Sequence, residues 1–294
     1  MIPAHHVDII VNGVLMGAIY ALIAVGLNLI YGVSRILNLA HGDFLMLGCA
    51  VTYAIYQLVG HTPLLALIII VPLFFLIGGL INNSLIKPLG KLGSESLVTT
   101  SVVVTLGISF IIVDLALFGS ARAGISTFGV AYMMPSVEIL NIYFSSVRLL
   151  SLASIIVITI LLRLIMMRTF IGKKIRALSQ NREAALALGI DESKVSAITF
   201  GLGTALAAMA GVFVLMITAV QATIGMSLTF KALIIIILGG MGSFVGAIVG
   251  GLLLGVVESY TMFYVGGEWI PVIGVLVLFV VLMVRPQGLF GRGG

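Results

Sequence analysis

The sequence predicts an all-α integral membrane protein with about eight transmembrane helices, forming a single domain over residues 1–294. Hydrophobic residues make up 61% of the chain and charged residues 9%, and the mean hydropathy is +1.29. A soluble domain carries about a quarter charged residues, so a surface this poor in charge requires lipid around it. In hydrocarbon only helices and closed barrels satisfy their backbone polar groups, and long unbroken apolar runs favour helices.

Apolar runs of the roughly 20 residues needed to cross a bilayer occur along the whole chain. Continuous runs predict spans over residues 7–30, 64–86, 97–118, 149–167 and 269–284. Two more are predicted over 43–59, which is short for a full crossing, and over 195–220. The region 228–264 is ambiguous, because Gly239, Gly240 and Gly242 interrupt it. The spans therefore include Gly-interrupted, broken helices.

The basic residues orient these spans, because cytoplasmic loops carry an excess of Lys and Arg. Twelve of the 15 basic residues fall in segments that this rule assigns to the cytoplasm: Arg35, Lys87, Lys91, Arg163, Arg168, Lys173, Lys174, Arg176, Arg182, Lys194, Arg285 and Arg292. The exceptions are Arg122, Arg148 and Lys231. The loop over about 119–148 is therefore predicted to face outward, and the C-terminus to be cytoplasmic. Five spans before the basic loop place the N-terminus outside, unless span 43–59 is re-entrant.

The remaining composition excludes several classes of site. Cys49 is the single cysteine, so no internal disulfide and no cysteine-rich metal site is expected. Residues 1–8 contain no Lys or Arg, so the first apolar run is not predicted to be a cleavable signal peptide. The net charge of +5 reflects where the basic residues lie relative to the membrane, and no nucleic-acid partner is expected.

The hydrophilic segment over about 168–194 predicts one short amphipathic helix on the cytoplasmic face. Ile175, Leu178, Arg182 and Ala185 follow helical spacing, Gly189 is placed to end the helix, and Asp191 or Ser193 can cap the next span. One interpretation is a surface helix at the lipid headgroups. The other is a docking helix that fits a groove on a cytoplasmic partner. The residues assigned to that docking are Arg176, Arg182, Glu183, Ala184, Ala185 and Gly189.

Two Gly-interrupted segments, one in each half of the chain, are the candidates for a translocation path. Substrate sites of transporters lie near the membrane midplane, where broken helices expose backbone groups. The candidate residues are Asn38, His41, Gly42 and Asp43 in the first segment, and Gly239, Gly240, Gly242 and Ser243 in the second. The alternative is that both are turns at the membrane edge, with His41 and Asp43 capping a helix.

Small residues recur where helices can approach closely in lipid. Gly246, Gly250 and Gly255 are assigned to such packing, within the subunit or against a second one, and Gly13 and Gly17 allow the same interpretation. Three ionisable residues fall inside or near predicted spans, where functional roles are common. These are Asp114, Lys231 and Glu258, and each is assigned a structural role.

Four segments together resemble the branched-chain amino acid permease family of ATP-binding-cassette (ABC) importers. Glu183-Ala184-Ala185, followed after three residues by Gly189, is similar to the EAA loop of importer permeases, without the Leu-Pro of its longer version. The runs NLAHGDF (38–44), LGGMGS (238–243) and RPQGLFG (285–291) resemble signatures of the branched-chain family. They occur in the expected order and resemble the smaller permease subunit of the high-affinity importer.

The resemblance implies an ABC importer permease fold in a bacterial inner membrane. It also implies four partners: two cytoplasmic ATPase subunits, a second related permease and an extracytoplasmic solute-binding protein. The chain has no G-x-x-x-x-G-K-[ST] run, so ATP and Mg are expected only in the partner ATPases, with no cofactor and no metal bound here. The substrate is expected to be a branched-chain or other neutral amino acid. The alternatives are a urea or short-amide permease and, less favoured, an ion-coupled secondary transporter or a membrane enzyme.

Overall fold

The computed structural model describes residues 4–60, 62–91, 94–122, 124–125, 127–130, 135–139 and 142–291. Arg292, one of the predicted cytoplasmic basic residues, lies outside these ranges. Parts of the predicted outward loop over 119–148 lie outside them as well.

Eight helices in the described residues are long and apolar enough to cross a membrane, as predicted. They are built on α1 (Ala4–Ser34), α2 (His41–Val59), α3 (Leu67–Ile81), α4 (Ser94–Arg122), α5 (Ser146–Arg168), α8 (Glu192–Ile217), α10 (Phe244–Tyr264) and α11 (Ile270–Val284). Short helical turns lengthen α3 and α11, namely η1 (Pro63–Ala66), the π-helix η2 (Asn82–Ile86), η3 (Lys87–Lys91) and η4 (Gly267–Trp269). The ambiguous region 228–264 resolves into α10 and a shorter apolar helix, α9 (Gly225–Gly239).

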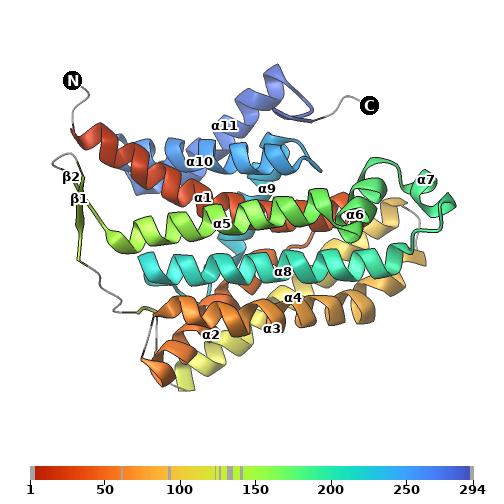
Figure 1. Ribbon diagram of the computed structural model, residues 1–294, viewed down its shortest axis with the longest axis horizontal. Helices are drawn as coiled ribbons and strands as arrows, with labels where there is room; N and C mark the ends of the chain where they lie inside the picture. Colours follow the sequence, from red (N-terminus) through yellow and green to blue (C-terminus); the bar gives the residue numbers. More distant parts are fainter. Residues whose placement is uncertain are drawn as a thin grey trace.

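The two ends of the bundle carry different structures. Two short helices, α6 (Phe170–Gln180) and α7 (Arg182–Ala187), project at one end, and the C-terminal segment lies at that end too (Figure 1). At the opposite end, near the N-terminus, β1 (Val137–Ile139) and β2 (Ile142–Phe144) pair antiparallel, with Val137 opposite Phe144. This hairpin was not predicted, because three-residue strands leave no period in a polar loop.

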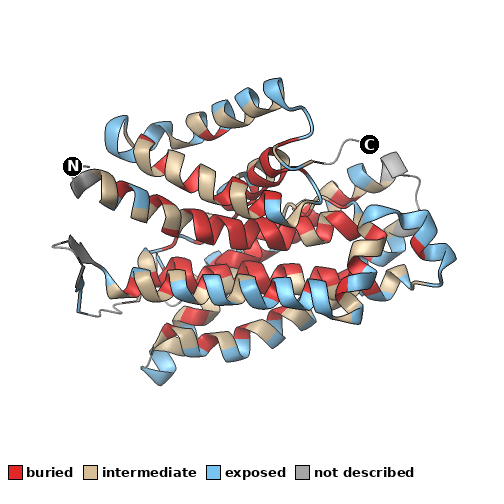
Figure 2. Ribbon diagram, turned by 45° about the horizontal axis from the view of Figure 1, so that its top comes forward, coloured by how far each residue is buried: buried red, intermediate tan, exposed pale blue. Residues whose placement is uncertain are grey.

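Helices α1 and α8 form the centre of the bundle. In the most apolar stretch of each, 72% and 83% of the residues are buried, against 6% in α11. Figure 2 shows the same contrast, with buried residues concentrated in the centre of the bundle and exposed ones toward its edges. Because lipid is as apolar as leucine, the outer helices can present leucine and isoleucine to it without cost, and close packing holds the centre together.

Glycines make the closest of these helix contacts. A Cβ atom on Gly255 of α10 would lie 2.3 Å from the Cα of Gly17 on α1, and one on Gly251 would lie 2.6 Å from the backbone nitrogen of Ala21. A Cβ on Gly13 would likewise lie 2.6 Å from the Cα of Val256. Only residues without side chains let α1 and α10 approach to this distance, so these glycines pack within the subunit.

Candidate functional site

The predicted docking segment folds as two helices, so the prediction of a single helix is wrong. Asn181 adopts an extended conformation between α6 and α7, and its side chain accepts a hydrogen bond from the Ala184 N–H at 3.0 Å. An N-cap of this kind begins a new helix. The next span is capped by Asp191, whose carboxylate accepts from the Lys194 N–H at 3.1 Å, and Gly189 follows α7 in the left-handed region, at φ +78°.

One face of α7 is open to the surroundings. Ala185 is buried and holds the helix against the bundle, whereas Glu183, Ala184 and Leu186 are exposed. Leu188, just beyond the helix, is 82% exposed. Leu186 and Leu188 are thus two exposed apolar residues close together in sequence and outside the spans.

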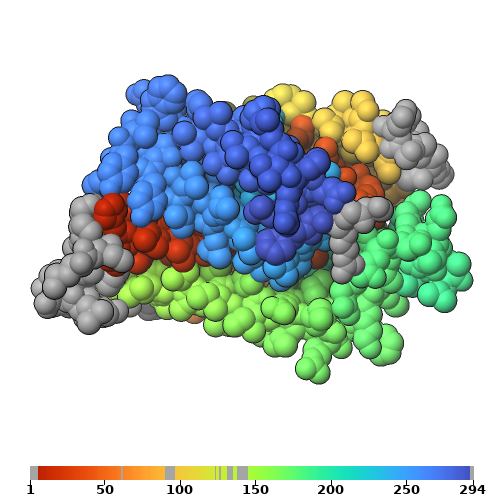
Figure 3. Space-filling model, turned by 90° about the horizontal axis from the view of Figure 1, so that it is seen from above, coloured from red at the N-terminus to blue at the C-terminus, as the bar shows by residue number. Residues whose placement is uncertain are grey.

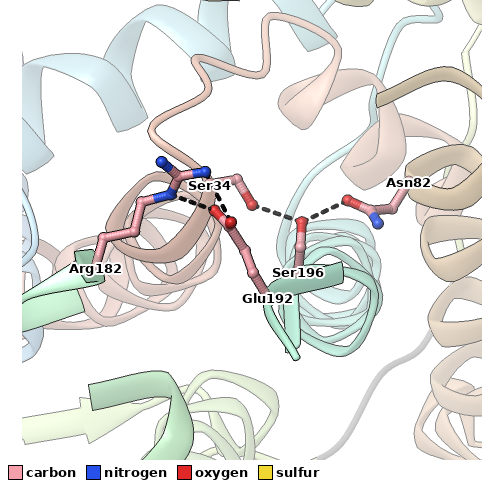
Figure 4. A network of polar contacts seen from close by, with 5 residues as sticks. All are labelled: Ser34, Asn82, Arg182, Glu192 and Ser196. Atoms are coloured by element: carbon pink, nitrogen blue, oxygen red, sulfur yellow. Dashed lines mark hydrogen bonds and ion pairs between the residues drawn. The ribbon is translucent and has the colours of Figure 1, made fainter. Parts of the chain in front are cut away.

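The base of α7 is tied to α8 by Arg182. Its guanidinium donates to both carboxylate oxygens of Glu192, at 2.7 and 2.8 Å (Figure 4). This hydrogen bonding raises the pKa of Arg182 above its ordinary value. At the cap of the same helix, the hydrogen bond from the Lys194 N–H lowers the pKa of Asp191. Arg176, the other predicted docking cation, contacts the Met167 sulfur at 3.5 Å instead.

A second, separate set of polar contacts involves Ser196, four residues after Glu192 on α8. The Ser196 hydroxyl of α8 donates to the Asn82 side chain at 2.8 Å, and Ser34 of α1 lies 2.7 Å from Ser196 (Figure 4). The foot of α8 is therefore connected to α1, to the π-helix η2 and to α7.

The first broken segment is buried where α2 begins. His41 is fully buried, and its Nε2 lies 3.0 Å from the Ile23 carbonyl oxygen of α1. The Gly42 N–H donates to the Thr229 hydroxyl of α9 at 2.8 Å, and a Cβ on Gly42 would lie 2.0 Å from the Gly225 carbonyl oxygen. The first turns of α2 and α9 thus meet inside the protein at a point that only glycine permits.

Asp43 lies at this meeting point, but it is not the N-cap of α2. That position belongs to Ala40, and Asp43 lies within the first turn. A Cβ on Gly225 would lie 2.0 Å from Asp43 Oδ1, so the carboxylate faces the positive N-terminal end of α9. Neither of its oxygens, nor His41 Nδ1, nor Asn38 Nδ2 has a hydrogen-bond partner among the described residues. Buried polar atoms are normally paired, and such exceptions call for an explanation.

The second broken segment is a turn at the end of the bundle that carries α6 and α7. Gly240 and Gly242 have φ of +97° and +87°, and the Gly242 N–H donates to the Asn28 side chain of α1 at 2.7 Å. Ser243 caps α10 by accepting from the Gly246 N–H at 3.0 Å. Gly242, Asn28 and Ser179 line a cavity of about 270 Å³ between α1, α5, α6 and α10.

The C-terminal signature docks on this glycine turn. The Leu289 and Phe290 N–H groups donate to the carbonyl oxygens of Leu238 and Gly239, at 2.8 and 3.0 Å. A Cβ on Gly240 would lie 2.4 Å from the Gly291 nitrogen. Two of the sequence signatures therefore form one structural unit, which the sequence alone did not reveal.

The two predicted path segments lie at opposite ends of α9. Residues 38–43 contact its N-terminal end at Gly225 and Thr229, and residues 240–243 follow its C-terminal end. Gly246 and Gly250, which were predicted to pack helices together, lie on α10 against the C-terminal end of α9. A Cβ on Gly246 would lie 2.0 Å from the Gly239 carbonyl oxygen, and one on Gly250 would lie 3.0 Å from that of Ile235.

Sequence reasoning missed a buried polar triad between α1, α9 and α10. Lys231 donates to Glu258 Oε2 at 2.7 Å and to the Tyr20 hydroxyl at 2.8 Å, and Tyr20 donates to the same Glu258 oxygen at 2.8 Å. The signal in the sequence was the pair of opposite charges, Lys231 and Glu258, inside apolar segments, which could have been predicted to form an ion pair. Asp114, by contrast, lies exposed on α4. No cluster of three or more potential metal ligands occurs in the described part of the chain.

Both the fold and the sequence of this chain are similar to those of known proteins. A solved structure entitled "PsaBC from Streptococcus pneumoniae in complex with Fab" contains a chain of the same fold, with a TM-score of 0.51 at 12% identity, covering 99% of this chain and 98% of that one. The high-affinity branched-chain amino acid transport system permease protein LivH of Salmonella typhimurium is 30% identical, covering 96% of this chain and 94% of its own. BraD of Pseudomonas aeruginosa, which has the same description, is 29% identical over 98% and 96%.

The family model described as the permease component of the branched-chain amino acid transport system matches residues 9–284. Apart from the first residues of α1, that range holds all the described spans, the two short helices α6 and α7, and the buried triad. The chain belongs to this family of multi-pass membrane permeases.

Proposed function

We propose that this chain is the membrane-spanning permease subunit of an ABC importer, and that it translocates branched-chain or other neutral amino acids delivered by a solute-binding protein. Its membership of the permease family over residues 9–284 carries the proposal. Without a P-loop of its own, the chain takes its energy from two cytoplasmic ATPase subunits that bind ATP and Mg. A second related permease completes the membrane unit.

In this proposal the end of the bundle that carries α6, α7 and the C-terminal segment faces the cytoplasm of a bacterial cell. Ten of the basic residues assigned there, from Arg35 to Arg285, fall within described residues whose side chains are placed. The β-hairpin and the N-terminus then face outward, where the solute-binding protein docks.

The exposed face of α7, with Glu183, Ala184, Leu186 and Leu188, is the contact for the ATPase. Support comes from the ion pair between Arg182 and Glu192 and from the polar contacts of Ser196, which connect α7 to three other elements. Movement of the ATPases would reach the bundle through these contacts. Arg176, on α6, and Gly189, which follows α7, belong to the same segment but take no part in the ion pair.

The path for substrate follows α1 in this proposal. Gly242 and Asn28 line the cavity at the cytoplasmic end of α1, which supports a role for the glycine turn. The unpartnered atoms of Asn38, His41 and Asp43 support a role for the junction of α2 and α9, because buried polar atoms without a partner call for a functional explanation and a polar substrate could supply the partners. At Gly240 even a single added Cβ atom would lie too close to Gly291. A bulky substitution there is expected to block uptake.

Reconstitution tests this function. The chain is co-expressed with its neighbouring permease and ATPase subunits, purified and placed in proteoliposomes with the binding protein outside and ATP inside. Uptake of labelled leucine that requires both ATP and the binding protein is the expected result. Uptake by the chain alone, driven by an ion gradient, would contradict the proposal, and ATP-dependent uptake of urea with none of leucine would reassign the substrate.

A further inference from the structure

A second cavity opens at the other end of α1, on the side that carries the hairpin. It measures about 600 Å³ and lies between α1, the start of α5, α10 and the start of α11. Small-molecule sites typically measure roughly 300–1,000 Å³. Figure 3 shows α1, in red, lying between α10, in blue, and α5, in yellow-green, on this face of the molecule.

The wall of this cavity combines two opposite charges with an apolar surface. Asp8 of α1 and Arg148 of α5 both line it, and both are exposed. No ion pair joins Asp8 to Arg148 among the described residues, where the three salt bridges lie elsewhere. Arg148 donates instead to the Asn12 side chain, which orients its guanidinium and leaves other N–H groups available.

The third charged residue of the wall is already neutralised. Glu258 lines the cavity, but its Oε2 accepts from Lys231 and Tyr20. Asp8 is therefore the carboxylate that is left for a cationic ligand. Met16, Met262 and Ile270 supply apolar surface beside these groups.

We propose that this cavity is the outer substrate site of the permease, where Arg148 binds the α-carboxylate of a neutral aliphatic amino acid and Asp8 binds its α-ammonium. The proposal rests on the proposed transport of amino acids and names residues that recognise them. A planar guanidinium pairs with a carboxylate through two parallel hydrogen bonds. The side chain of the ligand lies on the methionines, which adapt to different aliphatic shapes. Urea has neither charge, so this wall would give it no such anchor.

The first test needs no variant. Labelled leucine is equilibrated with the purified complete importer in the absence of binding protein, and three unlabelled competitors are added. Leucine is expected to compete at least tenfold better than leucinamide, which lacks the carboxylate, and than 4-methylpentanoate, which lacks the ammonium. Competition by leucinamide as strong as that by leucine would overturn the assignment of Arg148.

The second test changes the two charges in the complete importer. Arg148→Gln and Asp8→Asn are each expected to reduce leucine uptake at least tenfold while ATP hydrolysis and subunit composition are retained. Arg148→Lys is expected to recover part of the uptake, because it restores the charge without the fork. Arg122→Gln and Asp114→Asn change matched, exposed charges on α4, outside the cavity, and are expected to transport normally.

The outcomes separate this proposal from the proposed function. If the unmodified importer takes up leucine with ATP, and Arg148→Gln and Asp8→Asn do so at the same rate, the site is wrong and the function stands. If the unmodified importer takes up no amino acid, the function itself fails.

Discussion

The Arg182 guanidinium donates to both carboxylate oxygens of Glu192, and this ion pair joins the start of α7 to the start of α8. The two side chains are 57% and 26% exposed, and ion pairs at such sites contribute only about 0–1 kcal/mol to stability. The pair therefore contributes little to the stability of the fold, so its contribution to transport can be tested without unfolding the protein.

Glu192→Gln is expected to lower ATP-driven uptake several-fold while the free energy of unfolding changes by less than about 1 kcal/mol. The guanidinium loses its charged partner, so α7 can move without α8. Uptake in proteoliposomes and thermal unfolding in detergent measure the two effects.

The control is Lys194→Gln, which breaks the pair with Asp191, 3.3 Å long, within the first turn of α8. Because that pair does not reach α7, transport should persist. Exchanging the charges with Arg182→Glu and Glu192→Arg together should recover part of the lost uptake. A Glu192→Gln importer with full uptake would mean that this ion pair transmits nothing.

Leu188→Asp is expected to reduce the ATPase subunits that co-purify with the chain. Leu188 is 82% exposed beside α7, so a charge there leaves the fold intact and spoils an apolar contact with a partner. Val137→Asp is the matched control. Val137 is 44% exposed on β1, outside the spans and at the opposite end of the bundle. Equal recovery of ATPase with both variants would exclude the α7 face as the docking site.

The spans were predictable because hydropathy is a local property of the sequence, and the basic residues marked one end of the bundle in the same way. What was missed depends on neighbours that the sequence does not show. The single helix predicted from Ile175 to Ala185 runs through Asn181, and the role of Asn181 as a cap is visible only in the backbone. Tyr20, Lys231 and Glu258 are far apart in the chain, and only the packing of three helices brings them together.

Asp43 illustrates the same limit in the first broken segment. Its place near the start of a helix suggested an N-cap, but the chain turns at Asn38, whose side chain accepts from the Ala40 N–H at 3.1 Å. That turn places the N-cap at Ala40 and so starts the helix three residues earlier than an Asp43 cap would, and it leaves the Asp43 carboxylate facing α9.

Gly42→Ala is expected to destabilise the protein by roughly 1–3 kcal/mol, the usual cost of overpacking a tight contact. The added Cβ would lie 2.0 Å from the Gly225 carbonyl oxygen, so α2 and α9 must separate. Thermal unfolding in detergent measures the change. Gly107→Ala on α4 adds the same methyl group into open space and should cost nothing. An unchanged unfolding temperature for Gly42→Ala would show that α9 yields readily at this contact.

Lys231→Met and Glu258→Gln form the fourth test, because each leaves the other charge unpaired inside the bundle. Breaking a buried pair from one side costs about 3–5 kcal/mol. Lys231→Met should cost more than Glu258→Gln, since the stranded Glu258 side chain is 8% exposed and the Lys231 side chain 23%, which lets the lysine reach polar surroundings. Tyr20→Phe removes one hydroxyl and should cost only about 0.5–1.5 kcal/mol.

The double variant Lys231→Met with Glu258→Gln decides whether the two charges act as a pair. If they do, its loss of unfolding free energy is smaller than the sum of the two single losses, because no charge is left stranded. Transport by the double variant should then exceed transport by Lys231→Met alone. Losses that simply add would mean that Lys231 and Glu258 stabilise the bundle through separate contacts, and the triad would have no role as a unit.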